Sequence, residues 1–108
     1  MNEQVRQGDV LVRHVRKRDV SKMHRVNAVR GRIILARGEA TGHAHAIAAA
    51  RAALYRGKGG KFYLHLDGAS RLEHEEHAAI TLPPGFYEVT RQREYSPRDI
   101  SRSRRVAD

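Results

Sequence analysis

Apolar and polar side chains alternate along several short stretches of the chain. Residues 62–66 read Phe-Tyr-Leu-His-Leu, with Phe or Leu at the first, third and fifth positions. This period of two is typical of a strand with one buried face. Residues 10–15 read Val-Leu-Val-Arg-His-Val and follow the turn-like sequence Gln7-Gly8-Asp9. Their β-branched content predicts an early strand.

The remaining stretches predict a mainly β fold. Further strands are expected at 26–29, 32–37, 54–56, 72–82 and 86–95. Turns rich in Gly or Pro separate them, and the polar residues 16–25 are expected to form a loop. Many short strands with such turns are typical of a small antiparallel β-barrel or sandwich, which is the fold class that we predict.

Two segments carry helix signals. Residues 43–53 are rich in alanine, which favours helix, but Gly42 precedes them and no strong N-cap is present. We therefore expect two strands with a turn near Ala50-Arg51. Ser96-Pro97 suits the N-cap and first position of a short helix over 97–106. The expected organisation is a single β-rich domain over 1–95 and a basic C-terminal helix or tail over 96–108.

Composition excludes several classes of site. The chain has 108 residues and no cysteine, so a disulfide framework, a cysteine zinc site and a thiol nucleophile are all excluded. No apolar run approaches the length of a membrane helix, and the first residues lack a signal-peptide pattern. We expect a cytoplasmic protein that has no membrane partner.

The formal net charge of +9 predicts a polyanionic partner, RNA or DNA in the first instance. An alternative is a merely solvated basic surface. No base-reading motif is present, so contacts to the nucleic-acid backbone are expected. The candidate contact residues are Arg16, Lys17 and Arg18 early in the chain, and Arg91, Arg93, Tyr95, Arg98, Arg102, Arg104 and Arg105 near its end.

Two histidine motifs point to a metal site. His43 and His45 would share one face of a strand. In a strand over 72–82, His74 and Glu76 would point inward among apolar side chains, where they would need a partner. A short helix would instead place His74 and His77 on one face. The predicted ligands are His43, His45, His74, His77, Glu39 and Glu76, and such donors suit zinc, manganese, iron or nickel. Incidental surface histidines are the alternative.

The order Gly38, His43, His45 and then His74 or His77 resembles a minimal cupin-type barrel. That resemblance implies a metal-dependent enzyme with three histidines and one carboxylate, in which Glu75 or Glu76 would be the general base. The sequences Thr-Gly-His-Ala-His, His-Glu-Glu-His and Gln-Arg-Glu-Tyr together also resemble short uncharacterised bacterial and phage proteins. That second likeness implies no activity.

Three functions follow from these patterns. We predict a small basic metal-binding domain that acts as a nucleic-acid module for RNA or a ribonucleoprotein. The alternatives are a cupin-like metal enzyme and a structural accessory subunit without metal. Assembly into a homo-oligomer is compatible with each of them.

Overall fold

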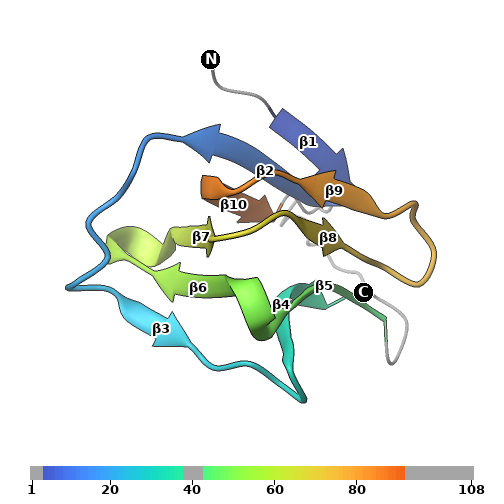
Figure 1. Cartoon of the computed structure of the whole chain (residues 1–108), viewed down its shortest axis with the longest axis horizontal. Helices are drawn as coiled ribbons and strands as arrows, with labels where there is room; N and C mark the ends of the chain where they lie inside the picture. Colours follow the sequence, from blue (N-terminus) through green and yellow to red (C-terminus); the bar gives the residue numbers. More distant parts are fainter. Residues whose placement is uncertain (1–3, 38–42, 92–108) are drawn as a thin grey trace, which may run out of the picture.

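The computed structural model describes residues 4–37 and 43–91. In chain order they form β1 (Gln4–Gln7), β2 (Val10–Val15), β3 (His24–Val26), β4 (Arg32–Arg37), β5 (Ala44–Ala48), the 3₁₀ turn η1 (Ala49–Arg51), β6 (Ala52–Arg56), the 3₁₀ turn η2 (Lys58–Gly60), β7 (Phe62–Leu66), β8 (Ser70–Leu72), β9 (Ile80–Leu82) and β10 (Gly85–Arg91) (Figure 1). All ladders are antiparallel, and these residues contain no α-helix. The prediction of a mainly β, antiparallel fold is confirmed. No helix of the described part is long and apolar enough to span a membrane.

Six strands form the larger sheet, in the order β1-β2-β10-β7-β6-β3. Buried positions recur at every second residue through much of β2 and β7, as their sequence pattern predicts. A two-residue turn joins β1 to β2, and its first residue, Gly8, has φ 60°. Such a left-handed residue matches the twist of a tight hairpin and favours glycine.

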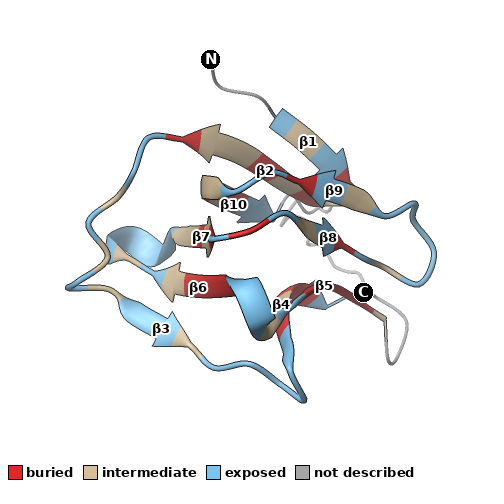
Figure 2. Ribbon diagram, in the orientation of Figure 1, coloured by how far each residue is buried: buried red, intermediate tan, exposed pale blue. Residues whose placement is uncertain are grey.

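Two shorter ladders, β4–β5 and β8–β9, complete the fold. Ala46 on β5 and Glu73 after β8 exchange two backbone hydrogen bonds of 2.9 Å, which join these ladders. One hydrophobic cluster draws on both ladders and on the larger sheet. Its most deeply buried members are Val10, Val12, Ile33, Leu35, Ile47, Leu54, Leu64, Leu66, Leu72 and Leu82 (Figure 2).

The prediction for the alanine-rich residues 43–53 is confirmed, whereas the prediction of a strand over 72–82 is not. Residues 43–53 contain β5 and the start of β6 with η1 between them, which confirms the two strands and the turn. The strand at 72–82 is wrong, because Leu72 pairs with Ile80 in the β8–β9 hairpin and the chain reverses between them. Residues 73–79 form a connecting segment, here called the histidine loop.

The edges of the larger sheet exclude the barrel, one of the two architectures that the sequence predicted. β1 and β3 are its two edge strands, and no ladder within the described residues joins them, so the sheet is open. The two strands expected at 26–29 and 32–37 are joined only by a bridge between Val29 and Arg32, because β4 pairs with β5 instead. The helix expected over 97–106 lies outside the described residues.

Candidate metal centre

Four imidazole rings from two distant segments lie together. His45 is on β5 and His43 precedes it, whereas His74 and His77 belong to the histidine loop. The ring centroids of His45 and His74 are 4.3 Å apart, and those of His74 and His77 are 4.7 Å apart. The centroids of His43 and His74 are 5.7 Å apart. The backbone bridge between β5 and the start of the loop sets this position. The structure therefore brings together the two histidine pairs that the sequence expected to meet.

Two carboxylates of the histidine loop lie beside the rings. Glu75 Oε1 accepts a hydrogen bond of 2.9 Å from the Ala44 amide, and this bond is the main reason that the pKa of Glu75 is lowered. Glu76 Oε2 lies 3.6 Å from His43 Nδ1, and its side chain is 67% exposed. The Glu76 amide donates to His74 Nδ1 at 3.0 Å. The inward orientation expected for Glu76 is wrong, because this residue is on a loop rather than on a strand face.

One nitrogen from His43, one from His74 and one oxygen from Glu75 all lie within 4.8 Å of one another, and these side chains could hold a metal ion. Glu75 was expected only as a catalytic base, yet its bond to the β5 backbone places it among the candidate ligands. Three predicted ligands lie around this group rather than in it: His45, His77 and Glu76. Glu39, the other predicted ligand, lies outside the described residues.

His45 is enclosed by protein and only 2% exposed. Its Nδ1 lies 2.8 Å from Gln7 Oε1. Gln7 is equally buried, and its Nε2 donates to the carbonyl oxygens of Leu72 and Ala78, both at 2.9 Å. Burial is the main cause that lowers the pKa of His45, and a neighbouring histidine adds to it. Both effects favour the neutral imidazole, which is the form that ligates metals.

The turn between β1 and β2 is a part of the site that the sequence patterns did not reveal. Asp9 Oδ1 lies 3.5 Å from His45 Nε2. A Cβ atom on Gly8 would come within 2.8 Å of His77 Nε2, so the absence of a side chain lets that ring lie against the turn. One signal was available. In a strand, Gln7 lies on the same face as the apolar Val5, which indicates that its side chain points inward. A buried amide requires hydrogen-bond partners.

A surface hollow of about 380 Å³ opens beside the histidine loop. Its lining combines the candidate ligands His74 and Glu75 with two cationic side chains, Arg32 and Arg71. Arg71 also lies 3.6 Å from the Glu73 carboxylate, whereas Arg32 is exposed at the start of β4. The candidate centre is therefore open to solvent through a hollow whose lining contains two arginines and two glutamates, Glu73 and Glu75.

The basic residues proposed for nucleic-acid contact are only partly described. Arg16 and Lys17 are exposed in the loop after β2. Arg18 is half-buried, with Cζ 5.6 Å from the centre of the Tyr63 ring. Arg91 Nε donates to the Leu35 carbonyl oxygen at 2.7 Å, so the fold itself engages this side chain. The other candidates lie outside the described residues: Arg93, Tyr95, Arg98, Arg102, Arg104 and Arg105.

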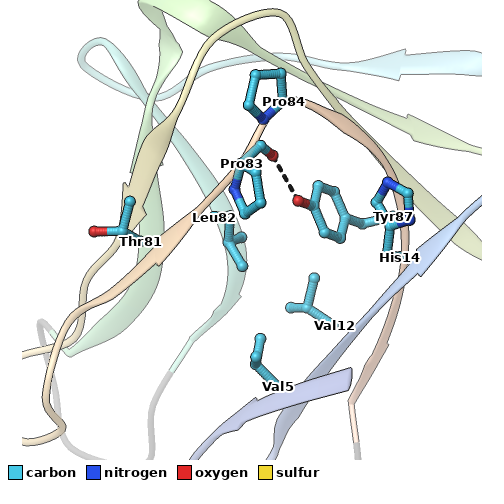
Figure 3. Close-up of a pocket in the computed structure, with 8 residues that line it drawn as sticks. All are labelled: Val5, Val12, His14, Thr81, Leu82, Pro83, Pro84 and Tyr87. Carbon is cyan, nitrogen blue, oxygen red and sulfur yellow. Dashed lines mark hydrogen bonds between the residues drawn. The ribbon is translucent and has the colours of Figure 1, made fainter. Parts of the chain in front are cut away.

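A separate cavity of about 300 Å³ contains none of these histidines. It is lined by Val5, Val12, His14, Thr81, Leu82, Pro83, Pro84 and Tyr87 (Figure 3). The Tyr87 hydroxyl donates to the Pro83 carbonyl oxygen, and the His14 ring meets the Tyr87 ring edge-on. With these polar atoms at one end, the cavity is a mostly apolar space at the small end of the range for ligand sites.

Comparison with known proteins identifies a family without a known activity. Residues 6–92 match a family model described as a domain of unknown function, DUF8820. The matched range includes the turn between β1 and β2 and both histidine motifs. It also covers the larger sheet, apart from the first two residues of β1. No curated protein and no solved structure matches the chain.

Proposed function

The chain belongs to the DUF8820 family of domains of unknown function, and we propose from its own residues that it binds a divalent metal ion through His43, His74 and Glu75. The observation that carries this proposal is the convergence of their ligand atoms within 4.8 Å, although the two segments are far apart in sequence. Two imidazoles and one carboxylate are a ligand set that zinc uses, and manganese, iron and nickel accept the same donors.

Metal binding would carry one local cost at His74. Its Nδ1 accepts a hydrogen bond from the Glu76 amide, so the proton of the neutral ring is on Nε2. Ligation of the ion through Nε2 would move that proton to Nδ1. The hydrogen bond from the Glu76 amide to Nδ1 would then be lost. The loss of this hydrogen bond costs about 1 kcal/mol, and the observed Kd of the ion would already include that cost.

Such an ion would fasten the histidine loop to β5. Apart from the Glu73 bridge, the described hydrogen bonds from the loop to the rest of the fold are few, namely those of Glu75 to Ala44 and of Gln7 to Ala78. An ion between His43 and the two loop ligands would add a further connection. The ion is therefore expected to protect the loop in particular from local opening.

The first experiment measures metal content in protein purified without a histidine tag. Wild type is expected to bind zinc, and His43→Ala and Glu75→Gln are each expected to lose at least one ion per chain. His24→Ala is the matched control, because His24 is an exposed histidine on β3. A wild-type protein that takes up no zinc, nickel, manganese or iron after dialysis against each ion would overturn the proposal.

We further propose that the partner of this metal-binding domain is a nucleic acid, held through its phosphate backbone. The net charge of +9 supports this, as do the exposed Arg16 and Lys17. Arg32, exposed at the start of β4 beside the candidate ligands, adds a further positive charge.

Binding of a single-stranded RNA, followed by fluorescence anisotropy at several salt concentrations, tests this second proposal. Each phosphate contact contributes about −0.7 to the slope of log K against log[salt] for single strands. Replacing Arg16 and Lys17 together by alanine is expected to make the slope shallower by about 1 to 1.4. The charge-preserving exchange Arg16→Lys with Lys17→Arg is the control. Absence of salt-dependent binding contradicts the proposal.

A metal-dependent enzyme of the cupin kind is the alternative function. It is favoured by the count of three candidate ligands, which leaves a fourth position of a tetrahedral ion for water. Glu76, exposed and 3.6 Å from His43, is then the candidate base. The cobalt-substituted protein separates the two functions. A visible spectrum that changes on addition of azide indicates an exchangeable position and favours the enzyme, whereas an unchanged spectrum favours a closed binding module.

A further inference from the structure

We propose that His45 Nε2 and Asp9 Oδ1 form a second cation position, separate from the group of His43, His74 and Glu75, and that Gln7 prepares it. The two atoms are 3.5 Å apart. Neither His45 nor Asp9 belongs to the group of ligand atoms that lie within 4.8 Å of one another.

The Gln7 side chain has only one orientation that satisfies its neighbours. Its Nε2 is 2.9 Å from the carbonyl oxygens of both Leu72 and Ala78. Those carbonyls accept only, so the amide nitrogen must face them, since a reversed amide would place oxygen against oxygen. Gln7 Oε1 therefore faces His45 Nδ1, at 2.8 Å. An amide oxygen accepts only, so His45 Nδ1 carries the proton and donates it.

This proton placement leaves a lone pair on His45 Nε2. The neutral ring has one proton, so Nε2 is an acceptor, and it faces the carboxylate of Asp9, which is also an acceptor. The His45 side chain is 2% exposed, so bulk water does not surround this nitrogen. Two acceptors that face each other, one of them buried, call for a cation between them.

The distance fits a metal ion better than a proton. A charge-assisted N–H···O bond is about 2.7–2.9 Å long, shorter than the 3.5 Å observed. Two ligand atoms bound to zinc at about 2.0–2.1 Å with a tetrahedral angle lie about 3.4 Å apart. The Asp9 side chain is 32% exposed, so an ion could enter from solvent and complete its coordination there.

A further imidazole, His77, lies against the same turn, although its ligand atoms do not form a group with those of His45 and Asp9 within 4.8 Å of one another. A Cβ atom placed on Gly8 would lie 2.8 Å from His77 Nε2 and 3.1 Å from His45 Cε1. The turn backbone therefore contacts both rings, and the two rings are stacked with centroids 5.8 Å apart. His77 is exposed and can adjust its side chain. The expected occupant is a divalent ion that accepts imidazole and carboxylate, with zinc as the probe.

Zinc titration by calorimetry, with variants that separate the two positions, tests the proposal. Wild type is expected to bind two zinc ions per chain. Asp9→Asn keeps the shape of the side chain and is expected to lose one ion or weaken it at least about 10-fold, while Glu75→Gln loses the other. Asp67→Asn, at an exposed aspartate outside the cluster, is the matched control and is expected to bind as wild type does.

Each outcome decides between the two sites. An ion that Asp9→Asn loses and Glu75→Gln keeps supports this second position, even where the first position proves empty. A single ion lost in both variants shows one shared site and overturns the separate position. Unchanged stoichiometry and affinity in Asp9→Asn also overturn it. A wild type without zinc overturns both proposals.

The role of Gln7 as a positioning residue has an independent readout that needs no metal. Long-range ¹⁵N–¹H spectra of the metal-free protein report which nitrogen of His45 is protonated, and protonated Nδ1 is expected. A proton on Nε2 in the wild type would show that Gln7 does not set the tautomer of His45. Gln7→Ala is expected to give a mixture of the two tautomers and 10- to 100-fold weaker zinc binding at this position.

Discussion

Replacing Gln7 by leucine is expected to destabilise the metal-free protein by about 3 kcal/mol. Gln7 is 2% exposed and connects β1 to three other segments, through Leu72, Ala78 and His45. Leucine is of similar size and apolar, so it fills most of the same space. It removes every one of these hydrogen bonds and leaves three polar groups without their partner.

The magnitude follows from how deeply each group is buried. A buried polar group without a partner costs about 1–3 kcal/mol. The bonds to Leu72 and His45 are buried, whereas the bond to Ala78 is partly buried and water can replace it. Two losses of about 1.5 kcal/mol give the total. For a domain of this size, such a loss lowers the melting temperature by roughly 10–20 °C.

Urea denaturation in the presence of a chelator measures this change, followed by far-ultraviolet circular dichroism. Gln4→Leu is the matched control, because Gln4 is on the same strand and exposed, and it is expected to change stability by less than about 0.5 kcal/mol. A loss below about 1 kcal/mol for Gln7→Leu would show that the three bonds add no net stability. Gln7 would then hold His45 in one orientation without a measurable gain in folding free energy.

Three further predictions concern the same region. Gly8→Ala is expected to destabilise by about 1–2 kcal/mol from its left-handed backbone alone, and more from the contact with His77; an unchanged urea midpoint would contradict this. The metal-free protein is expected to lose stability as the pH falls below about 6.5. The pKa of folded His45 is lowered from 6.5, so the unfolded chain binds more protons there; urea midpoints at about pH 7.5 and 5.5 measure the effect, and equal midpoints would refute it. Leu72→Ala, at a side chain that is 0% exposed, is expected to cost about 2–5 kcal/mol in the same assay, and a loss below 1 kcal/mol would count against the packing at the start of the histidine loop.

Local sequence patterns were sufficient for most strands. β-Branched residues predicted β2, alternation predicted β7, and the split of residues 43–53 into two strands followed from the missing helix cap. These are properties of neighbouring residues, and a strand's period is visible within five or six positions. The type of side chain also pointed to a candidate metal site, because imidazole and carboxylate are donors that several divalent metals accept.

The identity of the candidate ligands depended on contacts between distant residues. The histidine loop was expected to be part of one strand, but β8 and β9 pair with each other and turn the chain back at 73–79. Glu75 rather than Glu76 joined the candidate ligands, because the Ala44 amide binds its carboxylate. No local pattern distinguishes these two neighbouring glutamates.

By itself, the sequence determined that this is a mainly β protein with two histidine motifs that carry candidate metal ligands, because strand periodicity and residue type can be read from neighbouring positions. Only the tertiary structure decided that the turn between β1 and β2 shares the site. The bonds of Gln7 to His45 and Leu72 span 38 and 65 residues. A hydrogen bond depends on distance in space, so the order of residues alone could not show which imidazole nitrogen faces Asp9.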